Sequence, residues 1–206
     1  MKKVIFFIFT CFVSISLISC NTKIRDKKAI QECFDKYGLE AVKYIDNHTI
    51  AYYDHILKLA KTSDSIKISK MKFGDKTSVM VTRHLFKKED ILNMNGENLF
   101  ILLVANEMFS DDEKLSKSLI RNIEIEGNHA KGEIVLDEVG KATIKFQKIN
   151  SEWKFDLTSM LPAINKAFNK IISELDVSIT EDEFLIFFLK ELNQKEPSKD
   201  IWKPIL

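Results

Sequence analysis

Residues 123–136 read IEIEGNHAKGEIVL, and residues 142–157 read ATIKFQKINSEWKFDL. Apolar and polar side chains alternate along both segments, which is typical of strands with one face in the core and the other in water. Turn-forming residues interrupt the alternation at Gly127-Asn128, Val139-Gly140 and Asn150-Ser151-Glu152. The pattern therefore predicts an antiparallel meander joined by short turns.

The segment before the meander has helical periodicity. Within residues 29–61, apolar or semi-polar side chains recur at intervals of three and four residues from Val42 to Leu59, so one stripe faces a core. Gly38 is a poor helix former and can divide the segment into two helices, 27–36 and 39–61. Shorter helices are predicted further on, at residues 66–73, 76–85, 88–92 and 97–107.

Two more helices are predicted after the meander, at residues 159–175 and 180–193. The second begins with a capping box, in which Thr180 caps the amide of Glu183 and the Glu183 carboxylate reaches back. Residues 196–206 are predicted to be a loose tail. Together the segments predict an α+β fold, with long N-terminal helices packed on a curved antiparallel meander sheet and extra C-terminal helices.

The N-terminal segment predicts attachment to a membrane. Lys2 and Lys3 precede an apolar stretch that is short for a transmembrane helix and ends in Leu17-Ile18-Ser19-Cys20. This segment resembles the signal of bacterial lipoproteins. The resemblance implies that residues 1–19 are removed and that Cys20 becomes the acylated first residue. The alternatives are an ordinary cleaved signal and an uncleaved anchor.

The residues after Cys20 bear on location. Residues 20–28 are polar and basic, and they are predicted to form a short tether. Asn21 stands where an Asp would favour retention in the inner membrane, and the tether lacks the acidic cluster that some bacterial groups use for surface export. The resemblance therefore implies a lipid-anchored protein of the cell envelope, in the outer membrane and facing the periplasm.

Composition limits the class of protein. The chain has 206 residues, 45% hydrophobic and 30% charged, as in an ordinary globular protein. The full chain has 31 basic and 30 acidic residues, and loss of Lys2 and Lys3 leaves 29 and 30; this balance predicts no nucleic-acid partner. Once Cys20 is acylated, Cys33 is the only thiol left, so an internal disulfide is excluded. We favour Cys33 as a small core-facing residue over a nucleophile or an intermolecular bridge.

The order of helices and meander resembles the nuclear transport factor 2-like superfamily, an α+β cone. The resemblance is carried by residues 128–132 (NHAKG) and 146–158 (FQKINSEWKFDLT), with a further stretch at residues 83–100. It covers residues 29–161 and leaves residues 162–206 as a C-terminal helical extension. It implies a conical pocket, which is an active site in ketosteroid isomerases and polyketide cyclases and a binding or dimerisation surface in other members. A homodimer is compatible with this resemblance, and the fold alone assigns no function.

An isomerase-like site needs a base and a donor that converge in an apolar pocket. His48, Tyr52 and His55 are spaced by four and three residues, so one helix face can carry all three as pocket residues. The alternative, which we favour, places Tyr52 in the core stripe and both histidines at the surface. His48 and His55 lie two helical turns apart, about 10 Å along the axis, which is too far to chelate one ion. The sequence predicts no metal and no cofactor.

Aromatic residues gather in the last predicted helix. Phe184, Phe187 and Phe188 lie among further apolar residues. We favour packing of this cluster against the domain, and the alternative is a docking surface for a partner or for the membrane.

These observations leave three hypotheses for function. The favoured one is a cell-envelope lipoprotein that acts as a non-enzymatic binding module for a protein partner or a small ligand. The second is a toxin-neutralising immunity lipoprotein, and the third is a pocket enzyme of the isomerase or cyclase type. The sequence contains no Gly-rich phosphate loop, no Gly-x-Ser-x-Gly and no Cys-x-x-Cys, which is why we favour the first.

Overall fold

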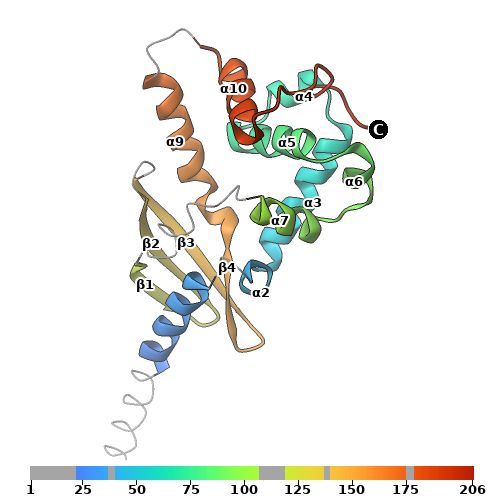
Figure 1. The fold of residues 1–206 in the computed structure, drawn as a ribbon. Helices are drawn as coiled ribbons and strands as arrows, with labels where there is room; N and C mark the ends of the chain where they lie inside the picture. The colour runs from blue at the N-terminus through green and yellow to red at the C-terminus, as the bar shows by residue number, and fades with distance from the viewer. Residues whose placement is uncertain (1–21, 37–39, 107–118, 137–139, 175–178) are drawn as a thin grey trace, which may run out of the picture.

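The chain folds as an α+β domain with a four-stranded antiparallel sheet of order β1-β2-β3-β4 (Figure 1). The computed structural model describes residues 22–36, 40–106, 119–136, 140–174 and 179–206. The strands are β1 Arg121–Glu126, β2 His129–Leu136, β3 Gly140–Ile149 and β4 Glu152–Asp156. An N-terminal helix over residues 22–35 is followed by α2 Ala41–Tyr44, α3 Asn47–Thr62, α4 Ser65–Ser69, α5 Phe73–Leu85, α6 Lys88–Asn93 and α7 Gly96–Ala105. After the sheet come a 3-10 turn, Leu157–Met160, and helices α9 Leu161–Glu174 and α10 Glu181–Asn193.

The predicted meander is confirmed. Each strand pairs antiparallel with the next, and Ile144 of β3 is buried while its neighbours Thr143 and Lys145 are exposed. The β3–β4 hairpin turns through Asn150 and Ser151, whose φ angles of 50° and 69° are left-handed. Two consecutive left-handed residues match the twist of the flanking strands, which is why so short a turn suffices.

The N-terminal helix packs on the sheet. Its Phe34 ring meets the Phe155 ring of β4 edge to face, with centroids 5.7 Å apart, and the Gln31 side chain accepts a hydrogen bond from the Ile120 amide. Residues 22–28 of the predicted tether, residues 20–28, are helical, and residues 20 and 21 lie outside the described residues. Sequence periodicity missed these two turns because their apolar contacts are few.

The predicted helix 39–61 is interrupted between α2 and α3, where residues 45 and 46 are extended. Ile45 forms a parallel bridge with Phe155, and the Asp46 amide donates to the Phe155 carbonyl at 2.9 Å. The Asp46 carboxylate caps α3 by accepting from the amide and the hydroxyl of Thr49, both at 2.9 Å. The Thr49 hydroxyl in turn accepts from the Leu157 amide at 3.0 Å, so the start of α3 is joined to the end of β4.

The remaining helices gather around α5, which contacts α3, α9 and α10. The Asn165 side chain of α9 accepts from the Gly74 amide at 2.7 Å and so satisfies the first turn of α5. Gly74 thus lies inside α5, although it comes directly after the helix that the sequence predicted at residues 66–73. That helix, α4, ends earlier, at Ser69.

The first turn of α10 docks on α5 through a buried cation. Lys76 is 3% exposed, and its ammonium donates to the carboxylates of Glu181 and Asp182. Burial disfavours this charge, but the two acceptors outweigh it and raise the pKa of Lys76 above its ordinary value. The predicted capping box of α10, Thr180 with Glu183, is confirmed in both of its hydrogen bonds.

The prediction of a loose C-terminal tail is wrong. Ile201 is buried, and the amides of Ile205 and Leu206 donate to the Lys61 carbonyl at the end of α3. The Arg83 guanidinium donates to three backbone carbonyls, those of Ala60, Ser63 and Ile201. Burial lowers the pKa of Arg83 to about 10, so it stays charged at neutral pH. A sequence pattern cannot predict these contacts, because every residue has a backbone carbonyl.

Replacement of Thr49 by valine tests the joint between α3 and β4. The substitution keeps the side-chain shape but leaves the buried Leu157 amide without its acceptor, so we expect Thr49→Val to lower the free energy of unfolding by about 1–3 kcal/mol. Thr62→Val is the matched control, because Thr62 is exposed at the other end of the same helix and bonds only to Lys58 within it. Equal urea midpoints of unfolding for the two variants would contradict a stabilising link between Thr49 and the Leu157 amide.

Candidate functional site

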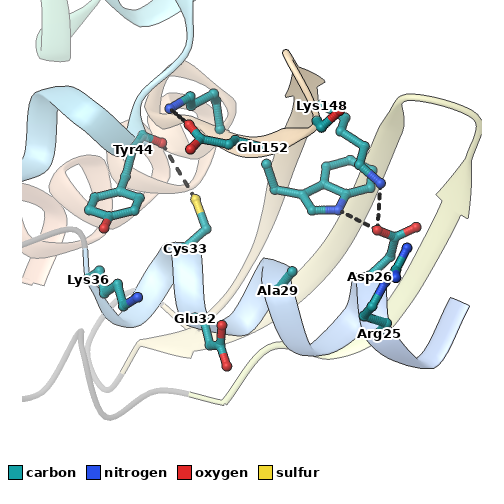
Figure 2. Close-up of a pocket in the computed structure, with 12 residues that line it drawn as sticks. Arg25, Asp26, Ala29, Glu32, Cys33, Lys36, Tyr44, Lys148 and Glu152 are labelled. Carbon is teal, nitrogen blue, oxygen red and sulfur yellow. Dashed lines mark hydrogen bonds and ion pairs between the residues drawn. The ribbon is translucent and has the colours of Figure 1, made fainter. Parts of the chain in front are cut away.

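A groove of about 510 Å³ lies between the N-terminal helix and the β3–β4 hairpin (Figure 2). A second hollow, on β1–β3 near His129 and Phe146, measures about 220 Å³. The larger groove is the candidate site because it also gathers seven charged side chains. The basic ones are Arg25, Lys36, Lys148 and Lys154, and the acidic ones are Asp26, Glu32 and Glu152.

Helical spacing builds one wall of the groove. Arg25, Ala29, Glu32 and Lys36 are three or four residues apart, so they share one face of the N-terminal helix. The β3–β4 hairpin supplies the facing wall, because its two-residue turn at Asn150–Ser151 brings Lys148 and the residues of β4 opposite that helix face.

Asp26 joins the two walls. Its carboxylate accepts from the Lys148 ammonium at 2.7 Å and from the Trp153 indole N–H at 3.1 Å (Figure 2). The Lys148 ammonium also lies 5.3 Å from the centroid of the Trp153 ring. The hydrogen bond from Lys148 is the main cause that holds the pKa of Asp26 below its ordinary value, against the opposing effect of burial. The carboxylate is therefore ionised and engaged at neutral pH.

Cys33 lies in the floor of the groove as a thiol. It is 4% exposed, and its sulfur donates to the Tyr44 carbonyl over 3.6 Å. Burial raises the pKa of Cys33 to about 12, so the reactive thiolate is scarce at neutral pH. The preference for a core-facing Cys33 over a nucleophile agrees with this burial.

Lys154 and Glu152 form the rim on the hairpin side. The Lys154 ammonium lies 2.8 Å from the Glu152 carboxylate and also donates to the Lys43 carbonyl. The hydrogen bond from Lys154 lowers the pKa of Glu152. The Glu152 side chain is 73% exposed and the Lys154 side chain only 18%, so an incoming group meets the carboxylate first.

The predicted pocket residues lie elsewhere, on α3. The Tyr52 hydroxyl donates to the Asp75 carboxylate of α5 at 3.0 Å, and burial raises the pKa of Tyr52. His48 and His55 are exposed. The structure thus places Tyr52 in the contact with α5 and the two histidines at the surface, which is the arrangement that the sequence favoured.

The other predicted residues are spread between core and surface. Phe184 packs on Phe73 of α5, with ring centroids 6.0 Å apart, and Phe188 is half-buried. Phe187 is 57% exposed. Cys20 lies outside the described residues. Within the described ranges, no group of three acidic, His or Cys side chains is placed to hold a metal ion, and no helix combines the length and apolarity needed to cross a bilayer.

Sequence reasoning missed the groove. Its helical wall begins inside the segment that was predicted to be a tether, and its other wall was noticed only as a strand motif, Trp153-Lys154-Phe155-Asp156. A usable signal was present: Asp26 is the one acidic residue among residues 22–31, which also carry Lys23, Arg25, Lys27 and Lys28.

Acid titration of Asp26→Asn tests the link between the walls. Because the pKa of Asp26 is lower in the folded chain, its stabilisation is present above the unfolded pKa of 3.8 and is lost as the pH falls through the folded value. We expect Asp26→Asn to lower the free energy of unfolding by about 1–2 kcal/mol at pH 7. The difference in the free energy of unfolding between Asp26→Asn and the parent chain should become smaller below about pH 4.

The control for this titration is Glu32→Gln on the same helix. Its side chain is 52% exposed and lies 3.7 Å from Lys28, so the change should cost less than about 0.5 kcal/mol. A loss for Asp26→Asn that stays constant from pH 7 to pH 2 would show that the Asp26 charge is not engaged.

Comparison with models of protein families, with characterised proteins and with solved structures finds no match. Any function must therefore be inferred from the residues of this chain and from their geometry.

Proposed function

We propose that the protein is a lipid-anchored binding module of the cell envelope, acylated at Cys20, whose groove receives a protein segment or a small polar ligand. The observation that carries the binding role is the state of the titratable groups in the groove. Asp26 is held as an ion by Lys148 and Trp153, and Cys33 is held as a protonated thiol. Such groups fix the shape and charge of a surface but are poor general bases and nucleophiles.

The mixed charge of the groove indicates the class of ligand. Its exposed charged side chains are Arg25, Glu32 and Lys36 on the helix and Glu152 on the hairpin. Because side chains of both signs line the groove, it suits a ligand that carries both signs, such as a polar peptide segment.

The proposal includes the nuclear transport factor 2-like cone. Its support is the order of elements, helices before a meander that ends in Trp153-Lys154-Phe155-Asp156, and the packing of Phe34 on Phe155. In such a cone the sheet curves around the N-terminal helix, and the groove is the opening beside its β3–β4 hairpin.

The anchor is tested by fatty-acid labelling in cells. We expect incorporation of an alkyne fatty acid into the parent chain and into Cys33→Ala, and its loss in Cys20→Ser together with a shift of the chain out of the membrane fraction. Cys33→Ala is the matched control because it removes the other thiol of the mature chain. Labelling that survives Cys20→Ser would contradict acylation at this residue.

The groove is tested by photo-crosslinking in the native cell. Benzoylphenylalanine at Glu32 would lie in the groove, whereas Asp35, exposed on the same helix, is not among the residues that line it. We expect an adduct of defined mass at position 32 and none at position 35. Identical adduct patterns at the two positions, or none at either, would contradict a ligand in the groove.

A further inference from the structure

Residues 22–28 of the N-terminal helix expose a basic surface. Lys23, Arg25, Lys27 and Lys28 are all exposed, and Ile24 among them is 64% exposed. Because these residues surround Ile24, the surface combines four positive charges with one apolar side chain. Clusters of four or more Lys and Arg side chains near a membrane attract anionic lipid headgroups.

The exposed charges of this surface are of one sign. Asp26 is the only acidic residue among residues 22–31, and its side chain is 13% exposed because it points at Lys148 and Trp153. The outward face therefore keeps its positive charge. Lys28 has one nearby carboxylate, that of Glu32 at 3.7 Å, and both side chains remain largely in solvent.

The cations of this surface have no acidic partner that turns outward beside them among residues 22–31. The one acidic side chain there, Asp26, is engaged on the sheet side. An anionic surface outside the helix would complement the four cations.

We infer that this basic surface lies on the anionic headgroups of the membrane, so that residues 22–28 hold the Arg25 end of the domain against the bilayer. The inference rests on the proposed acylation of Cys20. One residue, Asn21, lies between Cys20 and Thr22, so their Cα atoms are at most about 7 Å apart. Thr22 would thus lie within the range of about 10 Å over which charges act at 0.1 M salt.

This arrangement orients the groove. Arg25 belongs both to the basic surface and to the groove, while Lys36 lies at the other end of the same helix face (Figure 2). The Arg25 end of the groove then opens beside the headgroups, and a ligand enters from the Lys36 end.

The test is the release of the domain by trypsin from the full acylated chain on vesicles. Cleavage after Lys23, Arg25, Lys27 or Lys28 separates the domain from its anchor. We expect the initial rate of release to be at least about tenfold slower on vesicles with about a third phosphatidylglycerol than on pure phosphatidylcholine. About 1 M NaCl should abolish the difference, because it shortens the range of the charges to about 3 Å.

A matched pair of variants assigns the effect to this surface. Lys23→Gln with Lys27→Gln and Lys28→Gln leaves Arg25 as the cleavage site and should be released at equal rates on both lipids. Lys58→Gln with Lys67→Gln and Lys70→Gln removes as many exposed cations from α3 and its surroundings, at the far end of the molecule (Figure 1), and should keep the difference. Equal release of the parent chain on both lipids would overturn the inference.

Failure of the anchor is separable from failure of the surface. The intact mass of the purified chain shows whether acyl chains are present, and an unacylated chain would contradict the proposed function alone. Binding of the basic surface to lipid can still be measured with the unacylated chain. The fraction of chain that floats with phosphatidylglycerol vesicles at low salt is compared between the parent sequence and the variant with Lys23→Gln, Lys27→Gln and Lys28→Gln. Equal flotation of the two would overturn the inference in that case as well.

Discussion

The carboxylate of Asp26 is the constraint on which the functional end of the molecule depends. By accepting from Lys148 and Trp153 it joins residues 22–28 of the N-terminal helix to the β3–β4 hairpin, while Phe34 packs on Phe155 further along the same helix. The same contact turns the one acidic side chain among residues 22–31 toward the sheet, away from the exposed cations. The closure of the groove at this end and the charge of the exposed helix surface therefore both depend on Asp26.

Local rules predicted most of the fold. The period-two segments became four paired strands, because alternation and left-handed turn residues act over a few neighbours. The capping box at Thr180 formed for the same reason. The errors lie where distant groups decide: Ile45 leaves the helix to bridge Phe155, and the C-terminal residues are held by Arg83 and Lys61. The periodicity of a sequence does not identify such distant partners.

The candidate site was harder to predict than the fold. Its walls come from residues 25–36 and 148–154, which are more than a hundred positions apart, and neither contains a catalytic motif. Sequence reasoning instead singled out His48, Tyr52 and His55, which share a helix but do not line the groove; the Tyr52 hydroxyl bonds to Asp75 of α5. The distinctive feature in the sequence was a lone Asp among basic residues, and its role became clear once its partners were known.

Amide hydrogen exchange along residues 22–35 of the full chain tests the central claim most directly, namely that these residues are a helix fixed to the sheet by Asp26. We expect the amides of residues 26–34 to exchange at least about 100-fold more slowly than in an unfolded chain, with protection that falls in Asp26→Asn. Exchange of these amides at the unfolded rate would mean that the segment is a tether, and the groove and the basic surface would lose their basis.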